Sequence, residues 1–469
     1  MRLIEIILII LLFLLALQTF LPSSLGRFDR KILMGWLSVV TAASIPVHAL
    51  FEGIRWQLIP LYLLTVLFLV RGMFQLKDIY RVEPSAPLKA PPGRRVVAAI
   101  IILTIVASST TLFLDSLLPV FVLPNPTGEY SIGTTAFELT DQSRNETFTS
   151  DPDDFRRILV QAWYPTDDVA GLNRAPYVYN PFAFTSGIER SWGFPSIIVS
   201  HFPLVVTHSY EDAPMSDTET TFPVLLFSHG YGGVIMQNTA LMEELASHGY
   251  VVFSIAHPYE SLVTAFPNGE VIYEDDKDVF DDIGGSLNIW ANDTLFLVDQ
   301  LEIASNPDIP SLFWGKLDFS RIGALGHSFG GTTSEQVCLV DTRLQVGISF
   351  DSPHGNLARA ANMTKPFMLL FGPDYGNPEM NDPVYNNAET TCYGLYINGT
   401  RHHNFADVNL WSSLLKSYGL LGSIDGYRML EILTEYVVAF LDTHLMGNAS
   451  PLLDGPSTAY PEVMFHKKP

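Results

Sequence analysis

Four long apolar runs lie within the first 122 residues of this 469-residue chain. They cover about residues 4–20, 33–51, 56–71 and 96–122. Each approaches the ~20 residues that a helix needs to cross ~30 Å of hydrocarbon. A cleaved signal peptide would have one such run, and buried core helices would show polar faces that these runs barely have. We therefore expect a transmembrane region of four helices over residues 1–122.

Charge separates this region from the rest of the chain. The first 122 residues hold 11 Lys and Arg and 6 Asp and Glu, whereas the whole chain has 27 and 49. The remainder therefore carries 16 basic and 43 acidic residues, a net charge of −27. Such an acidic globular part argues against nucleic acid or anionic lipid head groups as partners. No pattern in the sequence indicates a protein partner.

The basic residues around the apolar runs predict an orientation. Arg2 and Arg55 are the basic residues of the N-terminus and the second loop, while the first and third loops together hold nine. These are Arg27, Arg30, Lys31, Arg71, Lys77, Arg81, Lys89, Arg94 and Arg95. Because positively charged loops remain in the cytoplasm, both ends of the four-helix region should face outwards. We expect the domain that follows to be extracytoplasmic.

Cysteine usage and ligand spacing limit the chemistry. Cys338 and Cys392 are the only two cysteines. In an oxidising compartment they either pair or remain half-buried free thiols, and the sequence leaves both alternatives open. Neither Cys-x-x-Cys nor His-Glu-x-x-His occurs, so we expect no metal and no cofactor.

Short apolar strands alternate with helical patterns after the apolar region. The strand patterns cover residues 157–164, 223–227, 250–255, 321–325, 344–350, 366–371 and 393–397. Alternation of this kind implies a mostly parallel sheet with helices on both faces. We therefore expect an α/β domain over residues 123–455. The stretch 168–218 has few regular signals and several aromatic residues, which indicates an inserted cap.

A Gly-x-Ser-x-Gly pattern at Gly326–Gly330 lies between the strand pattern 321–325 and a helix that extends to about residue 340. A serine on a tight strand-to-helix turn projects its hydroxyl, and the flanking glycines let neighbouring backbone approach. An ordinary turn serine is the alternative, but the strand before the motif and the helix after it favour a nucleophile. We expect that nucleophile to be Ser328 in an α/β-hydrolase fold.

Serine attacks an ester only when a base removes its proton and a carboxylate orients that base. In this fold the chain order is Ser, Asp, His. Asp351 and Asp374 each follow a strand pattern beyond Ser328, so both are candidates for the acid. His402 and His403 follow the strand pattern 393–397 and are the two candidates for the base.

The negative charge that develops on the ester oxygen needs backbone N–H donors. Phe329, directly after the nucleophile, is one expected donor, and Tyr231 in the glycine-rich stretch 227–233 is the other. A turn that only reverses the chain is the alternative for that stretch. His229 and His327 are expected to be packing or supporting histidines rather than bases.

Four of these stretches together resemble the platelet-activating factor acetylhydrolase family, in its plasma and intracellular isoform II lineage with bacterial relatives. They read Phe-Ser-His-Gly at 227–230, Leu-Ala-Ser-His-Gly-Tyr at 245–250, Gly-His-Ser-Phe-Gly-Gly at 326–331 and His-His-Asn-Phe-Ala-Asp at 402–407. The resemblance covers about residues 130–445 and leaves out the four apolar runs. It implies an ester hydrolase that needs no calcium and removes short or oxidised sn-2 acyl chains from phospholipids.

The resemblance also selects among the candidates. The family's acid follows the strand after the nucleophile helix, which implies Asp351, and its base opens a His-x-Asn-Phe-Ala-Asp stretch, which implies His402. Asp351 is followed by Ser-Pro-His-Gly, a more polar run than in the animal enzymes. A general carboxylesterase or polyester hydrolase without phospholipid preference is therefore the alternative. An inactive membrane receptor with a hydrolase fold is an alternative of another class, although the complete Ser, Asp and His set argues against it.

Overall fold

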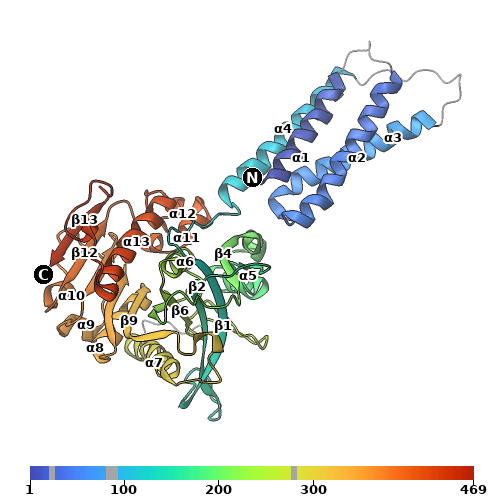
Figure 1. Cartoon of the computed structure of the whole chain (residues 1–469). Helices are drawn as coiled ribbons and strands as arrows, with labels where there is room; N and C mark the ends of the chain where they lie inside the picture. Colours follow the sequence, from blue (N-terminus) through green and yellow to red (C-terminus); the bar gives the residue numbers. More distant parts are fainter. Residues whose placement is uncertain (21–26, 81–92, 276–281) are drawn as a thin grey trace. The chain divides into compact units, whose positions relative to one another are not determined.

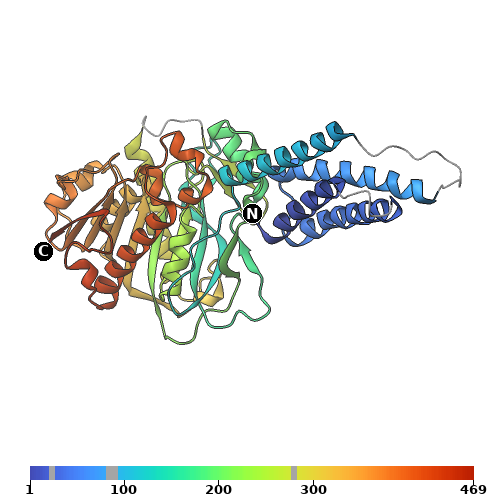
Figure 2. The same cartoon turned by 90° about the horizontal axis from the view of Figure 1, so that it is seen from above.

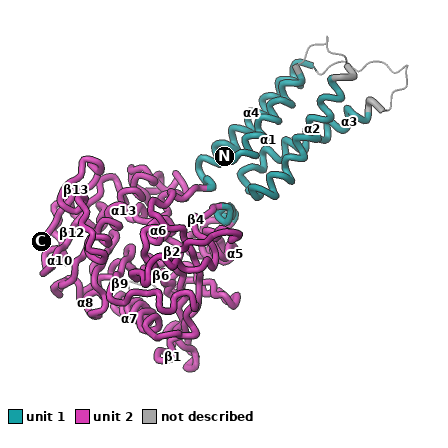
Figure 3. Tube along the Cα trace, in the orientation of Figure 1, with its two compact units in different colours: residues 1–120, 197–204 teal, residues 121–196, 205–469 magenta. Residues whose placement is uncertain are grey.

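The computed structural model describes residues 1–20, 27–80, 93–275 and 282–469 (Figure 1, Figure 2). The chain divides into two compact units (Figure 3). The first unit comprises residues 1–120 and 197–204, and the second comprises residues 121–196 and 205–469.

The first unit is helical. Its helices are α1 (Leu3–Leu17), α2 (Arg27–Phe51), α3 (Ile59–Tyr80) and α4 (Arg94–Leu117). Among the described residues, three helical segments are long and apolar enough to cross a membrane, namely Arg30–Phe51, Trp56–Lys77 and Arg94–Leu117. The first predicted span is the 15-residue helix α1, which one 3₁₀ turn extends to Phe20. Helix α4 ends before the predicted residue 122, because Pro119 disfavours helical backbone at Leu118. Arg81 and Lys89 lie outside the described residues.

The helices of the first unit are apolar on their outer surface as well as between one another. Leu12, Leu61 and Phe68 belong to a small buried core. Large apolar side chains such as Leu63 and Phe113 are each 61% exposed. Water disfavours so much exposed apolar surface, whereas hydrocarbon accepts it. The exposed apolar surface of these helices therefore agrees with the membrane-spanning runs expected from the sequence.

Charged side chains are buried near Arg55 in the same unit. The guanidinium of Arg55 donates to both carboxylate oxygens of Glu5, at 2.8 and 2.6 Å, and also contacts Asp115. Glu5, His48 and Glu52 form one group of potential metal ligands among the described residues. Because Arg55 already occupies both oxygens of Glu5, that carboxylate is neutralised without an ion.

The second unit is built on an 11-stranded sheet. Its order is β13–β12–β11–β10–β9–β5–β6–β2–β1–β4–β3. The strands are β1 (Ser131–Asn145), β2 (Phe155–Thr166), β3 (Arg174–Pro176), β4 (Val206–Glu211), β5 (Phe222–Ser228), β6 (Val251–Ala256), β9 (Leu317–His327), β10 (Leu344–Phe350), β11 (Phe367–Phe371), β12 (Cys392–Ile397) and β13 (Val463–Lys468). The run from β6 through β5 and β9 to β12 is parallel, while β2 and β13 pair antiparallel to its two ends.

Helices cover both faces of this sheet, as Figures 1 and 2 show. Helix α6 (Thr239–Ser247) packs against α13 (Gly426–Leu441), and α7 (Ile283–Glu302) packs against α8 (Phe329–Val340). All seven residues of β5 are buried, because a strand in the middle of a covered parallel sheet has no face toward water. The predicted α/β architecture, a mostly parallel sheet with helices on both faces, is therefore confirmed.

The predicted cap region 168–218 contains several short elements. Strands β3 and β4 add to the edge of the main sheet beyond β1. Helix α5 (Pro181–Trp192) begins at the capping residue Asn180, whose side chain accepts a hydrogen bond from the Ala183 N–H. Residues 197–204 group with the first unit.

Sheet register brings several strand ends to one edge. Ser228 at the end of β5 pairs with Gly326, and Phe350 at the end of β10 pairs with His327 at the end of β9. In open α/β sheets such carboxyl ends carry the ligand site. Loops that are far apart in the sequence therefore meet at this edge.

Candidate active site

Ser328 occupies the turn between strand β9 and helix α8. Its φ of 54° and ψ of −121° are values that non-glycine residues rarely adopt. The turn needs its glycines: a Cβ on Gly330 would lie 2.0 Å from the Ser228 carbonyl oxygen, and one on Gly326 would lie 2.3 Å from the Gly330 carbonyl. The structure thus places Ser328 in the strand–turn–helix context that the sequence predicts.

The three residues predicted as nucleophile, base and acid lie in one hydrogen-bonded chain. His402 Nε2 is 2.9 Å from Ser328 Oγ, and His402 Nδ1 is 2.7 Å from Asp351 Oδ2. Asp351 is fully buried, and its Oδ1 accepts a hydrogen bond of 2.7 Å from the Gly372 N–H. With Asp351 ionised, Nδ1 carries the ring proton and Nε2 faces the serine hydroxyl with a lone pair.

Asp374 and His403, the competing candidates for the acid and the base, lie outside this hydrogen-bonded chain. Asp374 accepts a hydrogen bond of 2.8 Å from the backbone N–H of His402, and another of 3.1 Å from Arg401. It therefore contacts the main chain of His402 and not the imidazole. His403 lies beside His402, with ring centroids 5.4 Å apart. Burial, together with the neighbouring His402, lowers the pKa of His403 to about 4.

The predicted oxyanion residues flank Ser328. Phe329 begins helix α8, and the Tyr231 ring meets the Phe329 ring edge-on at a centroid distance of 6.1 Å. The Tyr231 loop turns sharply through Gly232, whose φ is +62°. The Gly232 N–H donates to the Glu260 carbonyl, and the Gly233 N–H donates to the Gly230 carbonyl. Backbone of this loop is thus fixed beside the nucleophile.

A cavity of about 270 Å³ opens onto Ser328 and His402. Trp192 at the end of α5 and Trp411 are among its walls, with ring centroids 6.3 Å apart. Glu274 lines the same cavity and accepts a hydrogen bond of 2.8 Å from Ser191. We call this space the catalytic pocket. It is small and has bulky aromatic walls.

Comparison with known proteins places this arrangement in a family. The family model for platelet-activating factor acetylhydrolase, isoform II, matches residues 119–277 and 298–450. The chain belongs to this family. The predicted resemblance and the predicted class of enzyme, an ester hydrolase, are thereby confirmed.

Individual relatives agree with this membership in the platelet-activating factor acetylhydrolase family. An Arthroderma benhamiae protein named "Probable 1-alkyl-2-acetylglycerophosphocholine esterase" is 26% identical, over 77% of this chain and 98% of its own. Platelet-activating factor acetylhydrolase of Canis lupus familiaris is 24% identical, over 69% of this chain and 77% of its own. The solved structure of a ferulic acid esterase from Streptomyces cinnamoneus has a TM-score of 0.62 and 28% identity, covering 74% of this chain and 99% of that one. This similarity supports the α/β-hydrolase fold.

No sequence pattern identified Gln237 as part of the site. Its amide Nε2 donates to His327 Nδ1 at 2.8 Å, and its Oε1 accepts from the Gly230 N–H at 3.2 Å. His327 Nε2 in turn donates to the His402 carbonyl at 2.9 Å. Burial, reinforced by the nearby His402, keeps the pKa of His327 well below its usual value. The neutral ring therefore links the Tyr231 loop to the backbone of His402.

A second Ser–His–Asp arrangement lies behind the Tyr231 loop. His257 Nε2 is 3.2 Å from Ser228 Oγ, and its Nδ1 is 2.9 Å from Asp293. Burial lowers the pKa of His257, although its hydrogen bond to Asp293 opposes this. His257 stacks on Trp290, with ring centroids 3.9 Å apart. Since His257 and Asp293 are fully buried and Ser228 is 4% exposed, this group can support the fold but cannot reach a substrate.

His354, in the polar run after Asp351, was also missed. Its Nδ1 is 2.8 Å from Glu335 on helix α8, and its Nε2 is 2.5 Å from Asp382. Burial lowers the pKa of His354, but the two carboxylates outweigh burial and raise the pKa to about 10. The imidazolium therefore ties the loop after Asp351 to the nucleophile helix. Cys338 and Cys392 are free and buried, so the unpaired alternative holds for them.

Proposed function

We propose that this chain is a membrane-anchored serine ester hydrolase that cleaves short acyl esters, including sn-2 acetyl groups of phospholipids, through an acyl-enzyme. The observation that carries the proposal is the hydrogen-bonded chain from Ser328 through His402 to Asp351 at the mouth of a small pocket. Nucleophile, base and acid in this order are what acyl transfer by serine requires.

In the proposed mechanism, Ser328 Oγ attacks the ester carbonyl carbon while His402 Nε2 takes the hydroxyl proton. Asp351 keeps the proton on Nδ1 and stabilises the imidazolium that forms. The backbone N–H groups of Tyr231 and Phe329 donate to the oxyanion. His402 then gives its proton to the leaving alcohol, which leaves an acyl group on Ser328. Water, activated by His402, hydrolyses that acyl-enzyme, and no metal or cofactor takes part.

The size of the catalytic pocket supports a preference for short acyl chains. Its volume is about 270 Å³, and the indole rings of Trp192 and Trp411 restrict it. A longer acyl chain has to displace those rings, and the buried Trp411 resists displacement because it is packed against its neighbours. The fungal relative is named for 1-alkyl-2-acetylglycerophosphocholine, a substrate with a short sn-2 chain.

A general carboxylesterase is the second candidate. The structural similarity to a ferulic acid esterase favours it, since that protein is named for a substrate that is not a phospholipid. The polar Ser-Pro-His-Gly run after Asp351 favours it as well.

The proposed anchor consists of the three long apolar helical segments together with α1. Seven of the nine basic residues assigned to the first and third loops lie within the adjoining helices: Arg27, Arg30 and Lys31 in α2, Arg71 and Lys77 in α3, and Arg94 and Arg95 in α4. The excess of basic residues next to these two connections supports a cytoplasmic position for them. The hydrolase domain then lies on the extracytoplasmic side.

A substrate series with the purified full-length protein tests the function. We expect nitrophenyl acetate and an sn-2 acetyl phospholipid to be hydrolysed, rates to fall steeply with acyl length, and EDTA to have no effect. Ser328→Ala should lower turnover by about 10⁴- to 10⁶-fold without unfolding. Preference for long chains would indicate a lipase, and ester hydrolysis without phospholipid turnover would favour the carboxylesterase. Substantial activity in folded Ser328→Ala would falsify the mechanism.

A further inference from the structure

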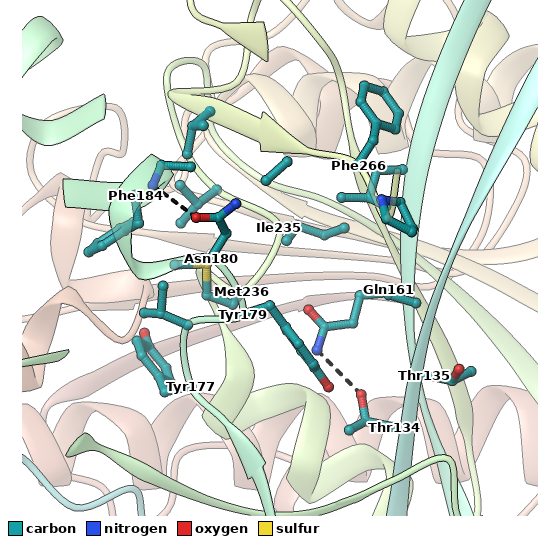
Figure 4. A pocket seen from close by; sticks show the side chains of 18 of the residues that line it. Thr134, Thr135, Gln161, Tyr177, Tyr179, Asn180, Phe184, Ile235, Met236 and Phe266 are labelled. Carbon is teal, nitrogen blue, oxygen red and sulfur yellow. Dashed lines mark hydrogen bonds between the residues drawn. The ribbon is translucent and has the colours of Figure 1, made fainter. Parts of the chain in front are cut away.

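A second and larger cavity lies in the hydrolase unit beside the catalytic pocket. Its volume is about 500 Å³, within the range of ~300–1,000 Å³ that is typical of small-molecule sites. Its lining comes from strands β1 and β2, the start of helix α5, residues 234–236 and the hairpin of β7 (Val263–Ala265) with β8 (Val271–Tyr273). Figure 4 shows side chains from these segments around one space.

This cavity is separate from the catalytic pocket but shares structural elements with it. Val234 lines both spaces. Helix α5 contributes Phe184 near its start to the larger cavity and Trp192 at its end to the catalytic pocket. Neither Ser328 nor His402 lines the larger cavity. A ligand bound there would therefore leave the proposed nucleophile untouched.

The inner wall of the cavity combines apolar and aromatic side chains with a few polar groups. Figure 4 shows Tyr179 in the middle of the space, between Met236 and Gln161. The Gln161 amide donates to Thr134 Oγ1 at 3.3 Å, so one polar patch is already organised on strands β1 and β2. Phe184 and Phe266 add aromatic surface. Such a wall suits an apolar ligand body that carries one polar group.

Charge restricts the class of ligand further. Glu211 and Asp212 line the cavity, and none of its described lining residues is a lysine, arginine or histidine. Asp212 is exposed and accepts a hydrogen bond of 2.7 Å from Thr135, which keeps its carboxylate beside the cavity. Partial burial raises the pKa of Tyr179, whose side chain is still 45% exposed, and both carboxylates add to this effect, so the phenol remains neutral. Arg157 lies over the Phe266 ring, 4.6 Å from its centroid, but its guanidinium is already paired with Glu270. An anionic ligand would therefore meet two negative charges with no unpaired cation among the described lining residues.

We propose that this cavity is a binding site for an organic cation that carries a short apolar arm, such as an alkyl quaternary ammonium ion. The faces of tyrosine and phenylalanine rings attract such cations, and the two carboxylates add long-range attraction. The apolar arm lies against Phe184 and Met236, while the ammonium group lies between Tyr179 and Glu211. The site does not depend on the ester hydrolase mechanism proposed above.

Binding of hexyltrimethylammonium to the full-length protein in zwitterionic lipid nanodiscs tests this proposal by calorimetry, with empty nanodiscs as the blank. We expect saturable 1:1 binding of the cation, and binding of hexanol and hexanoate at least about tenfold weaker. Equal binding of hexanol would remove the role of charge and overturn the proposal. No saturable binding of the cation would overturn it as well.

Variants locate the site. Ala265→Trp, at a partly exposed position in the wall, should abolish binding by filling the cavity. The double variant Glu211→Gln with Asp212→Asn, which keeps the shape of both side chains, should weaken binding by roughly five- to tenfold. Glu274→Gln is the matched control, because it removes a carboxylate from the catalytic pocket instead. If Glu274→Gln weakens binding and the double variant does not, the cation occupies the catalytic pocket and the proposal is wrong.

Discussion

Replacing Asp351 by asparagine tests the orientation of the base. The Asp351 side chain accepts two hydrogen bonds, from the Gly372 N–H on Oδ1 and from His402 Nδ1 on Oδ2. Asparagine has one oxygen acceptor and one NH₂ donor. Because the Gly372 N–H can only donate, the asparagine oxygen must face it, and the NH₂ group then faces His402. Nδ1 has to become an acceptor, so the ring proton moves to Nε2, which can no longer take the proton of Ser328.

The expected magnitude follows from this reversed tautomer. We expect kcat to fall by about 10⁴-fold, or about 5.5 kcal/mol of transition-state stabilisation, as loss of the correct tautomer does in serine hydrolases. KM should change by less than about threefold, because Asp351 is buried and does not line the catalytic pocket. The melting temperature should change little, since asparagine has the same shape.

Asp374→Asn is the matched control. Asp374 contacts the backbone N–H of His402 and the half-exposed Arg401, and an exposed pair of this kind contributes about 0–1 kcal/mol. We therefore expect less than about a tenfold loss of kcat. Initial rates of nitrophenyl acetate hydrolysis over a range of concentrations give kcat and KM for both variants. A severe loss for Asp374→Asn with a mild one for Asp351→Asn would refute the reasoning and place the acid after the later strand.

Three further predictions follow from other parts of the molecule. Gln237→Leu removes the link between the Gly230 N–H and His327, so kcat should fall by roughly 10- to 100-fold at a nearly constant KM. The control variant Gln345→Leu, at an exposed position, should have no effect. A change in melting temperature without a change in kcat would count against a positioning role for Gln237. The pKa of His354 is raised to about 10 in the folded protein, whereas in the unfolded chain it is about 6.5. Charged His354 therefore stabilises the fold fully below pH 6.5, and this stabilisation is lost as the pH rises through 10. In urea titrations His354→Gln should lower the free energy of unfolding by about 3 kcal/mol near neutral pH. The difference in free energy of unfolding between the two proteins should become smaller toward pH 10, and a difference that does not change with pH would contradict this. A reporter fused after residue 122 should be exported, and a cytoplasmic reporter would reverse the orientation.

Much of the architecture can be predicted from the sequence because it depends on local patterns. An apolar run of helical length needs no partner to be recognised, and the part of the chain that the structure describes has three helical segments long and apolar enough to cross a membrane. Alternating strand and helix signals predict the parallel sheet, because central strands such as β5 and β6 are buried on both faces. The glycines of Gly-x-Ser-x-Gly predict the turn at Ser328, since Gly326 admits the backbone of Gly330 four residues later. Gly330 also admits the Ser228 carbonyl, a distant contact that only the structure shows.

Contacts between distant segments required the tertiary structure. The residues alone left Asp374 as a competing candidate, and only the family resemblance selected Asp351. In the structure both lie beside His402, where Asp351 meets the imidazole and Asp374 meets the backbone. The Gln237 link to His327 joins residues 90 positions apart. The larger cavity is lined from several separate segments. Hydrogen bonds form only within about 3.5 Å and at favourable angles, and strand register sets such distances. A residue pattern predicts the local backbone conformation, whereas the distances between groups on distant segments are set only when the sheet assembles.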